Sequence, residues 1–193
     1  KLPLVIDAGA LDLVKGLRDY ADAHSRSLSR AILTPHHGEA ARLLAQLGSP
    51  RSRADIDADP AASAKELALL TGAIILLKSA TTVCSYLHHD QGSRTQEIVS
   101  IPQETPWAGV AGSGDVLAGA VAGIAAGFQA RAERRQGNPS ISEAECATLA
   151  SLGAWVHAQA AFRAGAGSQG HAHPIQAIDI ARALPEIIGE LCS

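Results

Sequence analysis

The sequence predicts an α/β fold in which a mainly parallel sheet is flanked by helices. Apolar runs of strand length alternate with longer stretches whose apolar residues recur at helical spacing, and this alternation is typical of parallel strands connected by helices. Of the 193 residues, 47% are hydrophobic, so the chain can bury a core. The most apolar run, residues 73–77, is followed directly by Lys78. Open α/β sheets bind ligands at the carboxyl ends of their strands.

The first part of the chain predicts two buried strands and three helices. We expect strands at residues 4–7 and 31–34 and helices at residues 10–23, 35–47 and 60–70. Thr34 and Pro35 form an N-cap and first-turn pair, and Pro60 similarly begins the third helix. Residues 51–59 are polar and mixed in charge, which indicates a surface loop.

The middle of the chain predicts a β-hairpin at the sheet edge, and the remainder is helical. Hairpin strands are expected at residues 82–87 and 95–101. His88 and His89 lie in the expected turn, and we interpret them as exposed loop residues because no third metal ligand follows at a diagnostic spacing. Further helices are expected at residues 116–130, 142–163 and 175–191, with Arg131, Arg134, Arg135 and Gly137-Asn138-Pro139 in a connecting segment.

Charge and cysteine content exclude several classes of function. The formal net charge of −3 gives no basic surface for nucleic acid or an anionic membrane. The three cysteines, Cys84, Cys146 and Cys192, are far apart, so they indicate neither a disulfide framework nor structural zinc. No apolar run reaches the length of a membrane span. We therefore expect a cytoplasmic protein that binds a small soluble ligand, with no nucleic acid and no membrane as partner.

Residues 112–119, Gly-Ser-Gly-Asp-Val-Leu-Ala-Gly, carry the strongest functional signal. Gly112 and Gly114 allow main-chain N–H groups to crowd around a phosphate, and the helix that follows points the positive end of its dipole at the same place. Asp115 would stand at the edge of this anion pocket, where it could accept a proton from a substrate hydroxyl. The alternative is a glycine-rich helix start in which Asp115 only interacts with the helix dipole.

Two further motifs lie at expected strand ends. Residues 33–39, Leu-Thr-Pro-His-His-Gly-Glu, place His36 and Glu39 in a first helical turn, where they can hold a polar ligand or, through oxygen, a hard cation. Residues 78–82, Lys-Ser-Ala-Thr-Thr, place a cation and three hydroxyls after the most buried strand, and lysine binds phosphate as a point charge. Each motif is weak alone, and Glu39 is also typical of a helix cap, but together they predict one crevice.

The order of these motifs resembles the ADP/ATP-dependent NAD(P)H-hydrate dehydratase family, the carboxyl-terminal domain of bifunctional NAD(P)HX repair enzymes. The resemblance runs from residues 3–11, Pro-Leu-Val-Ile-Asp-Ala-Gly-Ala-Leu, through the three motifs above to residues 177–185. It implies the ribokinase-like fold, a three-layer sandwich with a mainly parallel central sheet, in a single domain over residues 1–193. It also implies a hydro-lyase that uses ADP or ATP, with Mg²⁺, to convert hydrated NADH and NADPH to NADH and NADPH.

The resemblance implies roles for individual residues as well. By this resemblance, Asp115 contacts the substrate and is the best candidate for the catalytic base. The anion hole is matched by Gly112, Ser113 and Gly114, of which Gly114 also touches the nucleotide. The nucleotide-binding loop is matched by Lys78, Ser79, Ala80, Thr81 and Thr82. His36 matches the contact to the hydrated cofactor, and Glu39 matches the position where related sugar kinases organise magnesium.

The sequence departs from the family pattern at several positions. Gly9 replaces a usual aspartate, His37 replaces a proline and Ser79 replaces a glycine. Ser79 would narrow the approach of the backbone to the nucleotide if that position required a positive φ. The chain has no methionine and its first residues already have a strand pattern, whereas the family's domain begins with further strands and a glycine-rich segment. We therefore expect that the amino-terminal portion of the domain is missing.

Two alternatives to the dehydratase remain open. A ribokinase-like kinase of a small molecule, such as a vitamin precursor, would use the same aspartate and anion pocket, although such kinases more often carry asparagine at the position of His36. A nucleotide-binding fragment without turnover is the other alternative. For the dehydratase, the resemblance also implies a homo-oligomer and a fusion or partnership with an NAD(P)HX epimerase.

Overall fold

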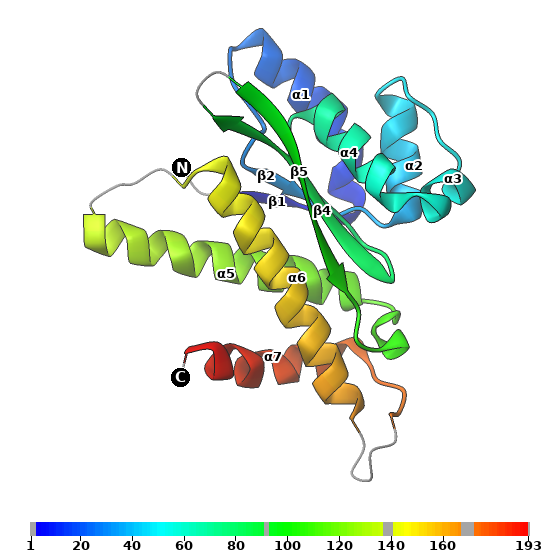
Figure 1. The fold of residues 1–193 in the computed structure, drawn as a ribbon, viewed down its shortest axis with the longest axis vertical. Coiled ribbons are helices and arrows are strands. Elements are labelled where there is room, and N and C mark those ends of the chain that lie inside the picture. Colours follow the sequence, from blue (N-terminus) through cyan, green and yellow to red (C-terminus); the bar gives the residue numbers. More distant parts are fainter. Residues whose placement is uncertain (1–2, 91–92, 137–140, 167–171, 193) are drawn as a thin grey trace.

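The sheet consists of three parallel strands followed by an antiparallel hairpin. The computed structural model describes residues 3–90, 93–136, 141–166 and 172–192. Within them, five strands lie side by side in chain order (Figure 1): β1 (Leu4–Ile6), β2 (Ala31–Leu33), β3 (Ile74–Leu77), β4 (Thr81–Asp90) and β5 (Ser93–Pro102). Strands β1 to β3 pair in parallel, and β4 and β5 are added in antiparallel orientation. The sheet is therefore mixed, and the expected hairpin at its edge is confirmed.

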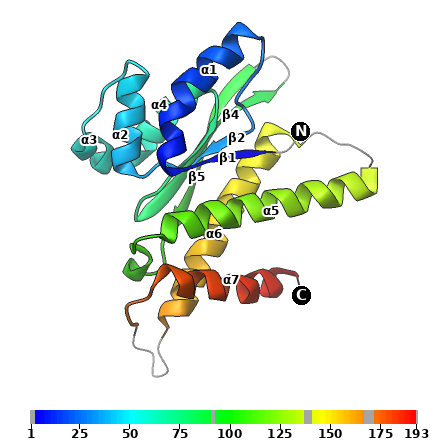
Figure 2. The same ribbon diagram turned by 180° about the vertical axis from the view of Figure 1, so that it is seen from behind.

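Helices cover both faces of the sheet (Figures 1 and 2). One face is covered by α1 (Val14–Ala23), α2 (His37–Gln46), α3 (Arg53–Ala58) and α4 (Pro60–Thr71). The other face is covered by α5 (Ser113–Gln136) and α6 (Glu143–Gly165), and α7 (Ala177–Cys192) packs against these two helices. Short 3-10 helices occupy Ala8–Leu13 and Pro106–Ala108. No helix within the described ranges is long and apolar enough to cross a bilayer.

The central strand of the five-stranded sheet, β3, shows why an unbroken apolar run forms a strand here. Successive side chains of a strand point to opposite faces. Ile75 and Leu77 accordingly join the core beneath α1 to α4, whereas Ile74 and Leu76 join the core beneath α5 and α6. All four side chains are fully buried, and each such burial contributes about 1.5–3 kcal/mol. Because both faces are covered, the strand needs no polar position.

Residues 51–59 differ from the expected loop, because Arg53–Ala58 forms helix α3. Ser52 Oγ accepts a hydrogen bond from the Asp55 N–H, and the Asp55 carboxylate accepts one from the Ser52 N–H, which completes a capping box. Ile56 is the one residue of this helix that is buried. A short helix with a single residue in the core has too little apolar periodicity to be recognised from sequence.

Three other boundaries differ from expectation. Helix α2 begins at His37, later than expected, because His36 and not Thr34 is its N-cap. His88 and His89 are paired residues of β4, so the expected turn is wrong at these positions. Helix α5 is longer than expected and includes the three arginines that were assigned to a connection. The turn residues Gln91 and Gly92 and the connection Gly137-Asn138-Pro139 lie outside the described residues.

Candidate active site

The carboxyl ends of the parallel strands bring one lysine and two carboxylates together. Asp7 follows β1, Glu39 lies in the first turn of α2 after β2, and Lys78 follows β3. Lys78 Nζ lies 2.8 Å from Asp7 Oδ1 and 3.8 Å from Glu39 Oε2. The buried Thr34 hydroxyl donates to the same Asp7 oxygen at 2.7 Å. The ammonium group is therefore held at the strand ends, where open α/β sheets bind their ligands.

The start of α2 is fixed by a capping box. His36 Nδ1 accepts hydrogen bonds from the N–H groups of Gly38 and Glu39 at 3.0 and 3.3 Å. In return, Glu39 Oε2 accepts a hydrogen bond from the His36 N–H at 2.8 Å. The Lys78 N–H donates to the Pro35 carbonyl at 2.8 Å, which ties this turn to the end of β3. The His36 side chain is 56% exposed, so its ring remains accessible beside Lys78.

The turn before α5 approaches the same lysine closely. Gly112 has φ +84°, a conformation that strains any residue with a side chain. Gly114 lies so near Lys78 that a Cβ at this position would be 3.1 Å from Nζ. Helix α5 begins at Ser113, and the first N–H groups of a helix have no acceptor within it. A lysine ammonium and a helix N-terminus therefore meet at one place, which suits a phosphate.

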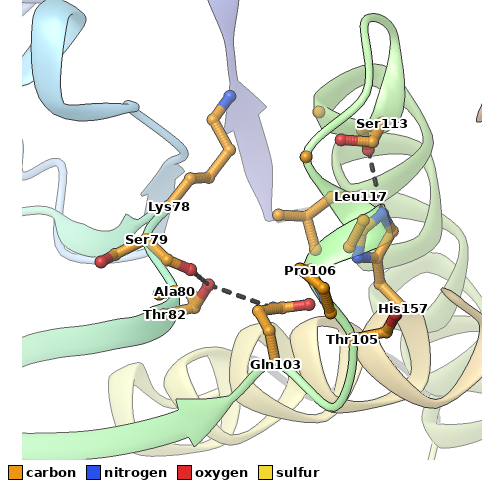
Figure 3. A pocket seen from close by; sticks show the side chains of 13 residues that line it. Lys78, Ser79, Ala80, Thr82, Gln103, Thr105, Pro106, Ser113, Leu117 and His157 are labelled. Carbon is orange, nitrogen blue, oxygen red and sulfur yellow. Dashed lines mark hydrogen bonds between the residues drawn. The ribbon is translucent and has the colours of Figure 1, made fainter. Parts of the chain in front are cut away.

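A cavity of about 620 Å³ opens beside this turn (Figure 3). It is lined by Lys78, Ser79, Ala80, Thr82, Gln103, Thr105, Pro106, Ala108, Gly109, Ser113, Gly114, Leu117 and His157. Gln103 fixes one wall, because its N–H donates to the Ala80 carbonyl at 3.1 Å and its side-chain Nε2 donates to Thr82 Oγ1 at 3.4 Å. The volume and the mixture of apolar and polar walls are typical of a small-molecule site.

The structure gathers most of the residues that the sequence predicted around this cavity. Those that line it are Lys78, Ser79, Ala80, Thr82, Ser113 and Gly114. Asp115 is exposed in the first turn of α5 and is not part of the cavity wall. Thr81, at the start of β4, is also exposed and also outside the cavity wall. His36 and Glu39 lie beside Lys78 instead. Ser79 has no positive φ, so the serine that stands in place of glycine does not strain the backbone.

Known proteins of similar sequence identify the family. A sequence model of the NAD(P)H-hydrate dehydratase family matches residues 1–183. The chain belongs to the NAD(P)H-hydrate dehydratase family. It is 34% identical over 163 residues to the ADP-dependent (S)-NAD(P)H-hydrate dehydratase of Neisseria meningitidis. This alignment covers 82% of this chain and 44% of that protein. It is 32% identical over 187 residues to the bifunctional NAD(P)H-hydrate repair enzyme of Corynebacterium glutamicum. This second alignment covers 95% of this chain and 31% of that protein.

Solved structures confirm the ribokinase-like fold of this family member. The Bacillus subtilis ADP/ATP-dependent NAD(P)H-hydrate dehydratase, co-crystallized with ATP/Mg²⁺, superposes with a TM-score of 0.62 at 23% identity. A ribokinase-like superfamily protein from Enterococcus faecalis gives a TM-score of 0.60 at 21% identity. Each alignment covers 97% of this chain, but 55% and 52% of the other chain. The chain thus spans about half the length, or less, of the relatives that it matches.

The sequence did not predict every residue of the site in this dehydratase family member. The residues that it did not predict are Asp7, Gln103, Thr105 and His157. Asp7 follows a buried strand as Lys78 does, so the strand-end rule could have found it. Gln103 follows an antiparallel edge strand and His157 lies within a long helix, and no local pattern distinguishes such positions from ordinary surface or core residues.

Glu39, which the resemblance implied as the magnesium position, contacts His36 and Lys78 in this structure. Its Oε2 accepts the His36 N–H and lies 3.8 Å from Lys78 Nζ, and its Oε1 lies 3.5 Å from His36 Nε2. Both oxygens therefore already face hydrogen-bond donors or the positive charge of Lys78. Across the described ranges, no group of three or more His, Cys, Asp or Glu side chains could hold a metal ion.

Proposed function

We propose that residues 1–193 act as one ribokinase-like domain of a dehydratase that uses ADP or ATP to remove water from hydrated NADH and NADPH. The observation that carries this proposal is the meeting of Lys78, the N-terminus of α5 and a cavity of about 620 Å³. Family membership supplies the substrate class, since the Neisseria meningitidis relative is named an ADP-dependent (S)-NAD(P)H-hydrate dehydratase. The reaction class is therefore a hydro-lyase that consumes a nucleotide.

The cavity is the proposed nucleotide site. Phosphate oxygens would accept hydrogen bonds from the first N–H groups of α5, and the Lys78 ammonium would balance their charge. Gly114 has no side chain, so a phosphate can approach the backbone and Lys78 at the same time. Residues 78–82, of which all but Thr81 line the cavity, form the wall along the nucleotide. These contacts would be strongest for the terminal, most highly charged phosphate.

Phosphorylation is the proposed way to remove a hydroxyl that is itself a poor leaving group. Asp115 accepts the proton of the substrate hydroxyl, the hydroxyl oxygen forms a bond to the terminal phosphorus, and the bond from that phosphorus to the remaining nucleotide breaks. Gly112, Ser113 and Gly114 stabilise the transferring phosphoryl group as an anion hole. The ring nitrogen then expels phosphate, and loss of a proton from the neighbouring carbon restores the double bond. The products are NAD(P)H, phosphate, and AMP from ADP or ADP from ATP.

Magnesium enters this proposal only as a companion of the nucleotide. Mg²⁺ prefers oxygen ligands and is commonly held by substrate phosphates with few protein groups. When bound there, it would neutralise charge that develops during phosphoryl transfer. Glu39 is engaged with His36 and Lys78, so its own part is to hold the lysine beside Gly112-Ser113-Gly114, which we call the anion turn.

The hydrated cofactor is proposed to lie on the open side of the anion turn. Asp115 is exposed there, and the half-exposed His36 ring is accessible beside Lys78. Relatives from Leishmania infantum and Mycobacterium tuberculosis are named bifunctional NAD(P)H-hydrate repair enzymes, which supports an epimerase as the working partner. We further propose that the protein acts in the cytoplasm as a homo-oligomer.

The test is recovery of NADH from its hydrate. The chain is incubated with chemically prepared hydrated NADH, Mg²⁺ and either ADP or ATP, and absorbance is followed at the NADH band. An Asp115→Asn variant is the matched control, because it keeps the size of the side chain but cannot act as a base. Recovery with the unaltered chain and a loss of at least about a hundredfold in the variant are expected.

The other outcomes separate the alternatives. Nucleotide binding without any NADH recovery would refute the dehydratase activity of this chain and favour a kinase of another substrate or a nucleotide-binding fragment. Equal rates for both proteins would remove Asp115 from the mechanism.

A further inference from the structure

A buried histidine of α6 contacts the anion turn from below (Figure 3). His157 is 5% exposed, and its Nε2 lies 3.0 Å from the carbonyl oxygen of Ser113, the first residue of α5. A carbonyl can only accept a hydrogen bond, so Nε2 carries the proton and donates. The ring therefore restrains the peptide group between Ser113 and Gly114, whose N–H belongs to the anion turn.

The other nitrogen of this ring has no partner in the part of the chain that the structure describes. His157 Nδ1 is buried and has no hydrogen-bond partner among the described residues, and the same is true of Gln103 Oε1. Both residues line the cavity. A neutral imidazole that donates through Nε2 can only accept through Nδ1, so the missing partner must be a donor. An unpaired buried polar atom is costly, so the partner of Nδ1 is expected among the groups that fill the cavity.

We propose that His157 is a positioning residue of the nucleotide site, which acts through both ring nitrogens. Nε2–H holds the Ser113 carbonyl and thereby aims the N–H groups of the anion turn at the terminal phosphate. Nδ1 accepts a hydrogen bond from the bound nucleotide. Phosphate oxygens are acceptors, so this donor comes from a hydroxyl or amine of the nucleoside. The inference rests on the proposed function, because it assumes that the cavity binds a nucleotide.

The surroundings of the ring support its neutral form. Burial lowers the pKa of His157, and the nearby Lys78 ammonium lowers it further, while the hydrogen bond to Ser113 opposes these effects. Near neutral pH the ring therefore carries one proton, on Nε2, and leaves Nδ1 as an acceptor. An imidazolium in this position would have no acceptor for its second N–H among the described residues.

Three variants of the full chain separate the two contacts. His157→Gln places an amide N–H near the position of Nε2 and keeps the donor to Ser113, but it lacks the acceptor at Nδ1. His157→Asn places an amide oxygen near the position of Nδ1 but is too short to reach Ser113. His157→Leu lacks both contacts. Gln159→Ala, two residues along α6 and outside the cavity wall, is the control.

Dissociation constants for ADP and AMP are measured by calorimetry, and the midpoint of thermal unfolding is measured for each variant. Because the anion turn binds the terminal phosphate, His157→Asn should weaken ADP about tenfold with little change for AMP, so the preference for ADP is lost. His157→Gln should weaken both nucleotides by about the same factor, up to tenfold, and keep the preference. His157→Leu should combine both losses, and Gln159→Ala should bind as the unaltered chain does.

Each contrary result refutes a stated part of this inference. An unchanged ADP preference in His157→Asn would overturn the restraint of the anion turn, and unchanged affinities in His157→Gln would overturn the contact through Nδ1. A lower unfolding midpoint in His157→Leu with unaltered affinities would reduce His157 to a structural residue. If the unaltered chain binds neither nucleotide, the nucleotide site itself is refuted, and the role of His157 is refuted with it.

Discussion

The packing of α5 against α6 predicts that one glycine cannot be replaced. Gly153 of α6 faces Val121 of α5, and a Cβ at position 153 would lie 2.6 Å from Val121 Cγ2 and 2.9 Å from Val121 Cα. Carbon atoms are in favourable contact at about 3.5–4.0 Å. The Cγ2 contact could be relieved by rotation of the valine, but the contact to Cα could not. Gly153→Ala must therefore push the two helices apart by more than about half an ångström.

The expected loss of stability follows from two opposing terms. Overpacking of this kind costs about 3 kcal/mol at the upper end of the usual range, and the better helix propensity of alanine returns about 1 kcal/mol. The net loss of about 2 kcal/mol should lower the unfolding midpoint of a domain of this size by about 4–8 °C. Thermal unfolding followed by circular dichroism measures the midpoint, and urea unfolding measures the free energy.

The same substitution on α5 provides the control. Gly123 is exposed, and a Cβ there would meet nothing within 4 Å, so Gly123→Ala should raise the free energy of unfolding by up to about 1 kcal/mol. Opposite signs for the two substitutions are the prediction. If Gly153→Ala were as stable as the unaltered chain, the close contact between α5 and α6 would not exist as described.

Three further predictions concern the site, acid stability and thiols. Gly114→Ala places a methyl group 3.1 Å from Lys78 Nζ, so calorimetry should show ADP affinity reduced about tenfold with an unfolding midpoint that is nearly unchanged. Burial lowers the pKa of His157 below 6.5, so the unfolded chain binds more protons than the folded chain. The free energy of unfolding measured in urea should therefore fall as the pH decreases below about 6.5. In His157→Gln, the share of this fall that comes from the histidine should be absent. A thiol reagent near neutral pH should modify only Cys192 in the folded chain, because the other two cysteines are buried and burial raises the pKa of each to about 11, whereas modification of three thiols would contradict the fold.

The parallel half of the fold was predictable because one physical signal dominates it. A strand covered on both faces must be apolar throughout, and polar residues can then only follow its carboxyl end. Lys78 and the turn from Thr34 to Glu39 were found by this rule, and the structure places them together. The hairpin was predictable for a different reason, namely two β-rich runs separated by turn residues.

The rest of the site depends on tertiary contacts that no local pattern contains. Asp7 gains its role only because parallel register places the ends of β1 and β3 near enough for a 2.8 Å ion pair. His157 gains its role from the crossing of α5 and α6, which is fixed by a glycine 4 residues earlier in the chain, at position 153. A histidine within a helix gives no sign in the sequence of which neighbour it will meet.

The position of Asp115 outside the cavity is consistent with the proposed chemistry. In-line displacement places the attacking and leaving oxygens on opposite sides of the phosphorus. Gly114 belongs to the cavity wall and Asp115, the next residue, does not, so one step along the turn leads from the proposed nucleotide side to the proposed acceptor side. If the Asp115 carboxylate pointed into the cavity, it would repel the nucleotide phosphates that Lys78 and α5 attract. Placed on the exposed side, it can take the proton of an attacking hydroxyl without weakening nucleotide binding, which is what a base for phosphoryl transfer requires.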